Sequence, residues 1–158
     1  MPARLKVVIT GTTSDNINEC VNFANHLAGI DQANSDVKSF SPLRILEFAS
    51  KEGHDIELWN LQKPLIPVPE ICLYEAHGLV LISSDLPRVL VDRNKPNLLK
   101  PDFPVLWLVT GERSSKYSSS SSNFNVHQVQ FTKSEEDSMP SEFFDWLGKS
   151  VLIFSRNQ

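Results

Sequence analysis

Short apolar runs recur along the chain at the spacing expected of strands in an α/β protein. Residues 5–9, 77–84 and 103–111 are mostly apolar and rich in branched side chains, as in strands buried on both faces of a parallel sheet. Two further runs, residues 43–50 and 54–61, flank the tripeptide KEG. A glycine in so short a connection predicts an antiparallel hairpin.

Helical periodicity appears between several of these runs. Apolar residues fall at helical spacing over residues 16–27, and residues 85–94 and 140–154 are the other two predicted helices. Residues 29–42 are polar and aperiodic, and residues 63–70 hold three prolines, so both segments are predicted to be loops.

This alternation predicts the α/β fold class, with a sheet covered by helices on both faces in three layers. A weaker run at residues 126–131 brings the expected sheet to about six strands, mostly parallel with one antiparallel strand at the edge. No internal repeat is present, so residues 1–158 are expected to form a single domain. Residues 114–123 are a low-complexity, Ser-rich loop within it.

Composition narrows the class of protein. An apolar content of 41% supplies an ordinary core, and a formal net charge of −4 gives no indication of nucleic acid as a partner. Cys20 and Cys72 are the only cysteines, so neither a disulfide framework nor a metal cluster is predicted. Without a membrane-length apolar run, a signal-peptide pattern or a lipidation motif, we expect a cytoplasmic protein with no membrane anchor.

In order and in local sequence, these elements resemble the small Ras/Rab-like GTPase domain. KVVITG, residues 6–11, is similar to its first strand entering the phosphate loop, and residues 44–60 are similar to the hairpin that ends in W-D-x-x-G. LYEAHGLVLISSD, residues 73–85, is similar to the Y-x-x-A-H/D-G-I-I-x-V-x-D string of a Rab-type fourth strand. The resemblance covers nearly the whole chain and implies a P-loop GTPase-like domain.

The residues that handle the nucleotide in that family are replaced here. After Gly11, the positions of the phosphate-loop lysine and Ser/Thr hold Ile17 and Asn18. Asn60 stands where the family has its magnesium-linked aspartate, and Arg113 stands where an aspartate reads guanine. A magnesium triphosphate needs a cationic cradle rich in N–H groups, and these losses remove it. The resemblance therefore implies a degenerate nucleotide site with no catalytic residue, no metal and no cofactor.

Other polar residues have simpler interpretations. Thr12, Thr13 and Ser14 form either a small anion-binding nest or, with Asp15 or Ser14 as the cap, the start of a helix, which we favour. The histidines are scattered and are expected to have structural or surface roles. Cys20 has no acid–base partner in the pattern and is expected to be packed in the core.

The last helix carries more aromatic residues than one core-facing stripe needs. That stripe consists of Phe143, Leu147, Val151 and Phe154. Phe144 and Trp146 lie off it and are predicted to bind a protein partner, together with Leu65 and Ile66 of the Pro-rich loop. The alternative is that Phe144 and Trp146 pack inward.

The resemblance implies a non-catalytic interaction or assembly module, a pseudo-GTPase that belongs to a larger complex. The alpha- and gamma-adaptin-binding family, which assists assembly of clathrin adaptor complexes, also keeps the strands and loses the nucleotide motifs. That family is the first type we expect, with function in vesicle trafficking; a kinetochore subunit with a GTPase-like fold is another example. The alternatives are a flavodoxin-like FMN-binding oxidoreductase, which would need an all-parallel sheet, and a divergent GTPase.

Overall fold

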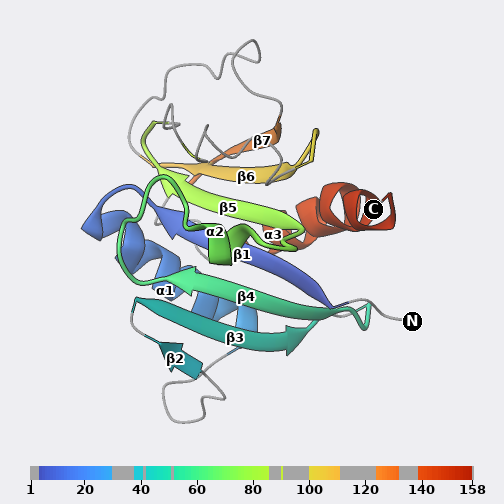
Figure 1. Ribbon diagram of the computed structural model, residues 1–158, viewed down its shortest axis with the longest axis horizontal. Helices are drawn as coiled ribbons and strands as arrows, with labels where there is room; N and C mark the ends of the chain where they lie inside the picture. Colours follow the sequence, from blue (N-terminus) through green and yellow to red (C-terminus); the bar gives the residue numbers. More distant parts are fainter. Residues whose placement is uncertain are drawn as a thin grey trace.

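One mixed sheet organises the molecule (Figure 1). The computed structural model describes residues 4–29, 38–40, 42–50, 52–85, 90, 100–110, 124–131 and 139–157. The strands are β1 (Leu5–Gly11), β2 (Lys38–Phe40), β3 (Leu43–Ala49), β4 (Asp55–Leu61), β5 (Gly78–Ser83), β6 (Pro104–Val109) and β7 (Asn125–Gln130). The helices are α1 (Ser14–Ala28), α2 (Glu70–Leu73), α3 (Met139–Trp146), a π-helical turn η3 (Leu147–Val151) and α4 (Leu152–Arg156).

The sheet has the order β2-β3-β4-β1-β5-β6-β7. β1 lies between β4 and β5 and is parallel to both, and β5, β6 and β7 continue in parallel. β3 pairs antiparallel with β4, with Ile45 opposite Trp59, so the predicted hairpin is confirmed. The α/β fold class with a mostly parallel sheet is confirmed as well.

The edge of the sheet differs from the expectation. The segment 29–42 was expected to be a loop, but Lys38–Phe40 form the short strand β2, which pairs antiparallel with β3. Three residues are too few for any periodicity to be read from the sequence. The predicted helix at residues 85–94 and the Ser-rich loop at 114–123 lie largely or wholly outside the described residues.

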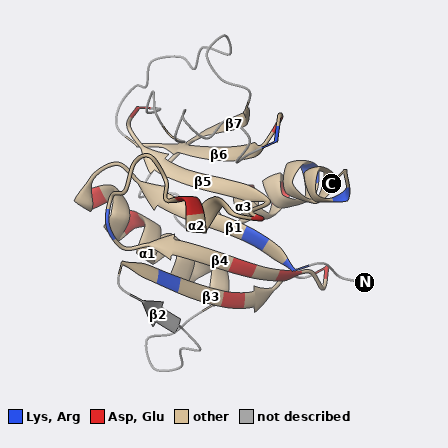
Figure 2. Ribbon diagram, in the orientation of Figure 1, with Lys and Arg blue, Asp and Glu red and all other residues tan. Residues whose placement is uncertain are grey.

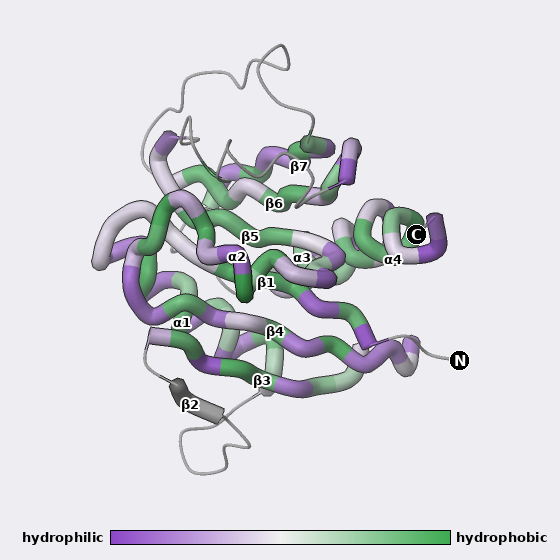
Figure 3. Tube along the Cα trace, in the orientation of Figure 1, coloured by the Kyte–Doolittle hydropathy of each residue, from purple (hydrophilic) through white to green (hydrophobic). Residues whose placement is uncertain are grey.

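Each face of the sheet carries its own hydrophobic core. The α1-side core, centred on Ile9, Phe23, Leu58, Leu106 and Phe143, is covered by α1 and α3. The α2-side core is centred on Val8, Leu73, Leu81, Phe103 and Trp107, and includes α2. Figure 3 shows β5 hydrophobic along most of its length, whereas β3 and β4 alternate with hydrophilic positions. The central strands are therefore the ones buried on both faces.

The carboxy-terminal helix joins the two cores. Phe143 belongs to the α1-side core, whereas Phe154 packs edge-to-face on Phe103 of the α2-side core, with ring centroids 5.6 Å apart. Between them the π turn η3 interrupts the continuous α-helix that the sequence predicted. A π turn inserts extra chain into a helix and so shifts the faces that follow it.

Candidate functional site

The junction between β1 and α1 lies where open α/β sheets bind ligands, at the carboxyl ends of the parallel strands. Only Thr12 and Thr13 separate Gly11, the last residue of β1, from the first residue of α1. The Thr13 Oγ1 accepts a hydrogen bond from the N–H of Asn16 at 3.1 Å, and the Thr13 carbonyl accepts one from Ile17 at 3.0 Å. The helix therefore begins inside the segment that a phosphate loop would occupy, with these N–H groups already bonded.

The helix-cap interpretation of this segment is confirmed, with one correction. The capping residue is Thr13, not Ser14 or Asp15. Thr13 has φ −132° and ψ 165°, the extended backbone that an N-cap requires, whereas Ser14 already belongs to the helix.

The side chain of Asn16 fills the space beside Gly11. A Cβ atom on Gly11 would lie 2.5 Å from the Asn16 Cβ and 3.0 Å from the Ile82 carbonyl oxygen of β5. The Thr12 Oγ1 donates to the Asn16 Oδ1 at 3.1 Å, and the Asn16 Nδ2 donates to Glu19 at 3.4 Å. Asn16 is thus packed directly against Gly11 at the end of β1.

Among the described residues, the positions that the resemblance compares with nucleotide ligands do not gather into a cation site. Ile17 is buried at 5% exposure, and Asn18 is exposed on α1. Asn60 is fully buried on β4, where its Nδ2 donates to the Leu61 carbonyl at 3.3 Å. Arg113 lies outside the described residues.

Asn60 belongs to an internal polar pair between α1 and the hairpin. It lies directly opposite Arg44 of β3, whose Nη2 donates to the Asn25 Oδ1 of α1 at 2.8 Å. Within the described part of the chain, the Arg44 Nε and the Asn60 Oδ1 are buried without hydrogen-bond partners. Burial lowers the pKa of the Arg44 guanidinium. A guanidinium here, in place of carboxylates, gives this position the wrong charge for magnesium.

Trp107 links the carboxyl ends of β5 and β6 through hydrogen bonds. Its indole Nε1 donates to the Ser83 Oγ at 3.0 Å, and the Ser83 Oγ donates to the Asp85 carbonyl at 2.7 Å. The N–H of Thr110 donates to the Ser83 carbonyl at 2.9 Å. No local sequence pattern indicates this network, because it depends on the register of two strands that are distant in the chain.

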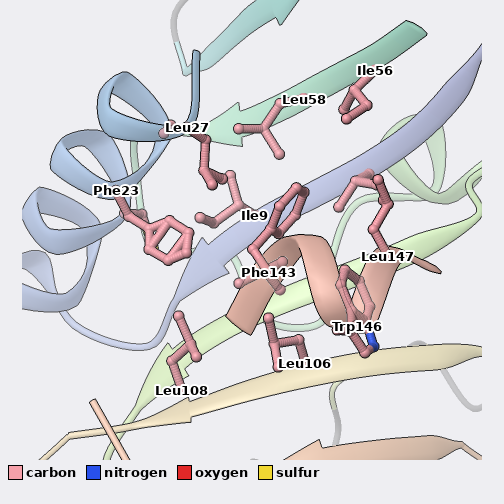
Figure 4. Close-up of a cluster of buried hydrophobic side chains, with 14 of the residues drawn as sticks. Ile9, Phe23, Leu27, Ile56, Leu58, Leu106, Leu108, Phe143, Trp146 and Leu147 are labelled. Carbon is pink, nitrogen blue, oxygen red and sulfur yellow. The ribbon is translucent and has the colours of Figure 1, made fainter. Parts of the chain in front are cut away.

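Trp146 is not an exposed partner anchor, so that prediction is wrong. It is 2% exposed, and a Cβ atom on Gly78 would lie only 2.8 Å from its Cη2. Figure 4 shows Trp146 with Phe143 and Leu147 among the side chains of the α1-side core. The spacing i, i+3, i+4 of these three residues is the helical pattern that could have indicated burial. Phe144 is half-buried against the same core, with its ring 5.3 Å from that of Phe143.

Large apolar side chains are exposed around α2 instead. Ile71 is 69% exposed and Tyr74 is 64% exposed. Leu65 and Ile66, predicted from the sequence, are half-buried against the α2-side core in the same connection between β4 and β5. We call the two exposed residues, Ile71 and Tyr74, the α2 patch. The string EICLY alone could not show that Ile71 and Tyr74 are exposed while Cys72 and Leu73 are buried.

Lys6 fixes the α2 patch to the sheet. Its Nζ donates to the carbonyls of Ile71 and Tyr74 at 3.1 and 2.7 Å, and lies 3.8 Å from the centre of the Trp59 ring. The Trp59 indole in turn donates to Glu57. Figure 2 shows this one basic position on β1 among the acidic positions of β4 and α2. Burial lowers the pKa of Lys6, and the charges of Glu57 and other groups oppose that shift.

Neither cysteine of the described part of the chain is placed as a reactive thiol. Cys20 and Cys72 are buried, and burial raises the pKa of both thiols, so neither is an activated nucleophile. Within the described ranges, no group of three or more His, Cys, Asp or Glu side chains is placed to hold a metal ion. None of the helices described is long and apolar enough to cross a membrane.

Comparison with protein-family models and with curated proteins finds no match for this chain.

Proposed function

We propose that this chain is a non-catalytic, GTPase-like interaction module, a pseudo-GTPase that acts through protein partners. The observation that carries the proposal is the β1–α1 junction, where Asn16 fills the space beside Gly11 and α1 begins after two residues. A phosphate loop needs a longer segment with free N–H groups and a lysine. The sequence losses at Ile17 and Asn18 thus coincide with a physical closure of the site.

The topology of the sheet supports the same class. The resemblance calls for an antiparallel hairpin beside the first strand and a parallel continuation on its other side. β3 and β4 form that hairpin next to β1, and β5, β6 and β7 form the continuation. The antiparallel pair argues against the flavodoxin-like alternative, which would need every strand to be parallel.

We expect no binding of GTP or GDP at micromolar concentration in the presence of magnesium. The reason is the occupied space beside Gly11 and the missing lysine at Ile17. Titration with a fluorescent guanine nucleotide measures this, with an active small GTPase as the positive control. Saturable, magnesium-dependent binding would show that the closed junction opens and would favour the divergent GTPase; saturable FMN binding would favour the oxidoreductase.

The α2 patch is the surface that this function would use. Exposed Ile71 lies in the four-residue helix α2, exposed Tyr74 directly follows it, and the carbonyls of both accept hydrogen bonds from the Lys6 Nζ. A rigid platform that exposes apolar side chains is typical of a protein-binding surface, because little conformational entropy is lost on binding.

Ile71→Ser and Tyr74→Ser are expected to weaken partner binding by about 30-fold each, because an interface anchor contributes about 2 kcal/mol. The alpha and gamma adaptins are the first partners to test, in a quantitative pull-down with the purified variants. Melting temperature should be nearly unchanged, because both side chains are mostly exposed. The matched control is Ile153→Ser, which removes a side chain that is 52% exposed on α4. If Ile153→Ser weakens partner binding and the two α2 variants do not, the partner surface lies on the carboxy-terminal helix.

A further inference from the structure

Lys6 and His77 form a reciprocal pair that joins β1 to the end of the β4–β5 connection. The Lys6 N–H donates to the Nδ1 of the His77 ring at 3.0 Å, and the His77 N–H donates to the Lys6 carbonyl at 2.8 Å. The regular ladder between β1 and β5 begins one residue later, with Val7 opposite Gly78. The imidazole thus takes the place of a backbone carbonyl and extends the ladder by one residue.

This geometry fixes the protonation state of the ring. A nitrogen that accepts a hydrogen bond carries no proton, so His77 is neutral with its proton on Nε2. An imidazolium has two N–H donors and no acceptor. Protonation at Nδ1 would therefore leave the Lys6 N–H facing another donor.

The two charged groups near His77 have opposite effects on its pKa. Burial lowers the pKa of His77; the carboxylate of Glu75, in the same connection, raises it, and the ammonium of Lys6, on β1, lowers it. That ammonium is the same group that holds the Ile71 and Tyr74 carbonyls. Both ends of the Lys6 residue therefore anchor the connection, the side chain at α2 and the backbone at His77.

We propose that the Lys6–His77 pair is a pH-sensitive latch, in which protonation of the His77 Nδ1 breaks its bond to the Lys6 N–H and releases the end of the β4–β5 connection from β1. Tyr74 of the α2 patch lies three residues before His77, and its carbonyl remains bonded to the Lys6 Nζ. The latch is independent of the proposed function; only its effect on partner binding rests on that proposal.

The direction of the pH effect follows from linkage. Because the folded state lowers the His77 pKa, the released state binds the proton more readily than the latched state does. The latch contributes its full stability above the unperturbed histidine pKa of about 6.5. That contribution falls as the pH drops below this value and levels off below the lower, folded-state pKa.

Amide hydrogen exchange of the full chain, followed by NMR from pH 8 to pH 5, tests the latch. Below pH of about 6.5 the protection factor of the Lys6 amide should fall by about tenfold per pH unit and then level off, since one pKa unit is a factor of ten in the opening equilibrium. The amide of Val80, in the central ladder, should keep a constant protection factor. Nitrogen chemical shifts of His77 should show the Nε2–H tautomer at pH 8.

Variants separate the latch from general acid destabilisation. His77→Asn offers an amide oxygen near the position of Nδ1 but does not titrate, so Lys6 protection should become independent of pH. His54→Asn, a change at a half-buried histidine of the β3–β4 turn, should leave the wild-type pH dependence intact. Constant Lys6 protection down to pH 5 in the wild type, an Nδ1–H tautomer, or an unchanged pH dependence in His77→Asn would each overturn the proposal.

Discussion

Trp146→Ala is expected to lower the free energy of unfolding by about 3–5 kcal/mol, the range measured when a large buried aromatic side chain is truncated. Trp146 is 2% exposed and packs on Gly78, whose missing side chain leaves room for the indole. Its ring lies 5.8 Å from that of Phe143, so the cavity would open inside the α1-side core. Denaturant unfolding monitored by circular dichroism measures the change.

Two comparisons make this result informative. Trp146→Phe keeps an aromatic ring on Gly78 and should cost clearly less than alanine, while Phe144→Ala, at a half-buried position, should also cost less. The indole Nε1 of Trp146 is buried without a partner within the described residues, so phenylalanine removes a poorly satisfied donor as well. An unfolding free energy within about 1 kcal/mol of the wild type for Trp146→Ala would mean that the carboxy-terminal helix does not pack on β5 as described.

Gly11→Ala is expected to lower the free energy of unfolding by about 3 kcal/mol, at the top of the range for overpacking a core. The added Cβ would meet the Asn16 Cβ at 2.5 Å and the Ile82 carbonyl oxygen at 3.0 Å. Neither atom is the end of a flexible side chain, so α1 or β5 must move. Thermal and denaturant unfolding of the purified variant measure this cost.

Gly148→Ala is the matched control, because no atom lies within 4 Å of the Cβ that it would add. That variant should be neutral or slightly more stable than the wild type, since alanine favours helical backbone over glycine by about 1 kcal/mol. If Gly11→Ala is as stable as Gly148→Ala, the junction is not closed, and the argument against a phosphate site loses its structural support.

The central strands were predictable because their sequences hold a local signal. Residues 5–9 and 77–84 are mostly apolar and rich in branched side chains, and such runs indicate strands that are buried on both faces. The hairpin of β3 and β4 was predictable for a similar reason, because its signal is the short glycine-containing connection between the two strands. The strand β2 was missed because three residues carry no period, and its pairing with β3 is what makes it a strand.

For the β1–α1 junction, the sequence could predict only which nucleotide-binding residues are missing. The sequence by itself determined that Ile17 and Asn60 stand where the proposed class would need a lysine and an acidic magnesium ligand. The sequence also contained the i, i+3, i+4 spacing of Phe143, Trp146 and Leu147 that is typical of a buried helical face. Phe144 lies off this face and suggested that the helix had a second, exposed aromatic face. These are properties of residue identity and local spacing, which need no coordinates.

Only the tertiary structure decided that Asn16 packs against Gly11 and that the side chains of Ile71 and Tyr74 are exposed. Asn16 fills the space beside Gly11 only because α1 begins at Ser14 and packs against the end of β5. Ile71 and Tyr74 are exposed in a segment whose carbonyls accept hydrogen bonds from Lys6, a residue of a strand distant in sequence. The Lys6 contacts join residues more than sixty positions apart, and a local sequence pattern carries no information about which distant side chain will bond to a given turn.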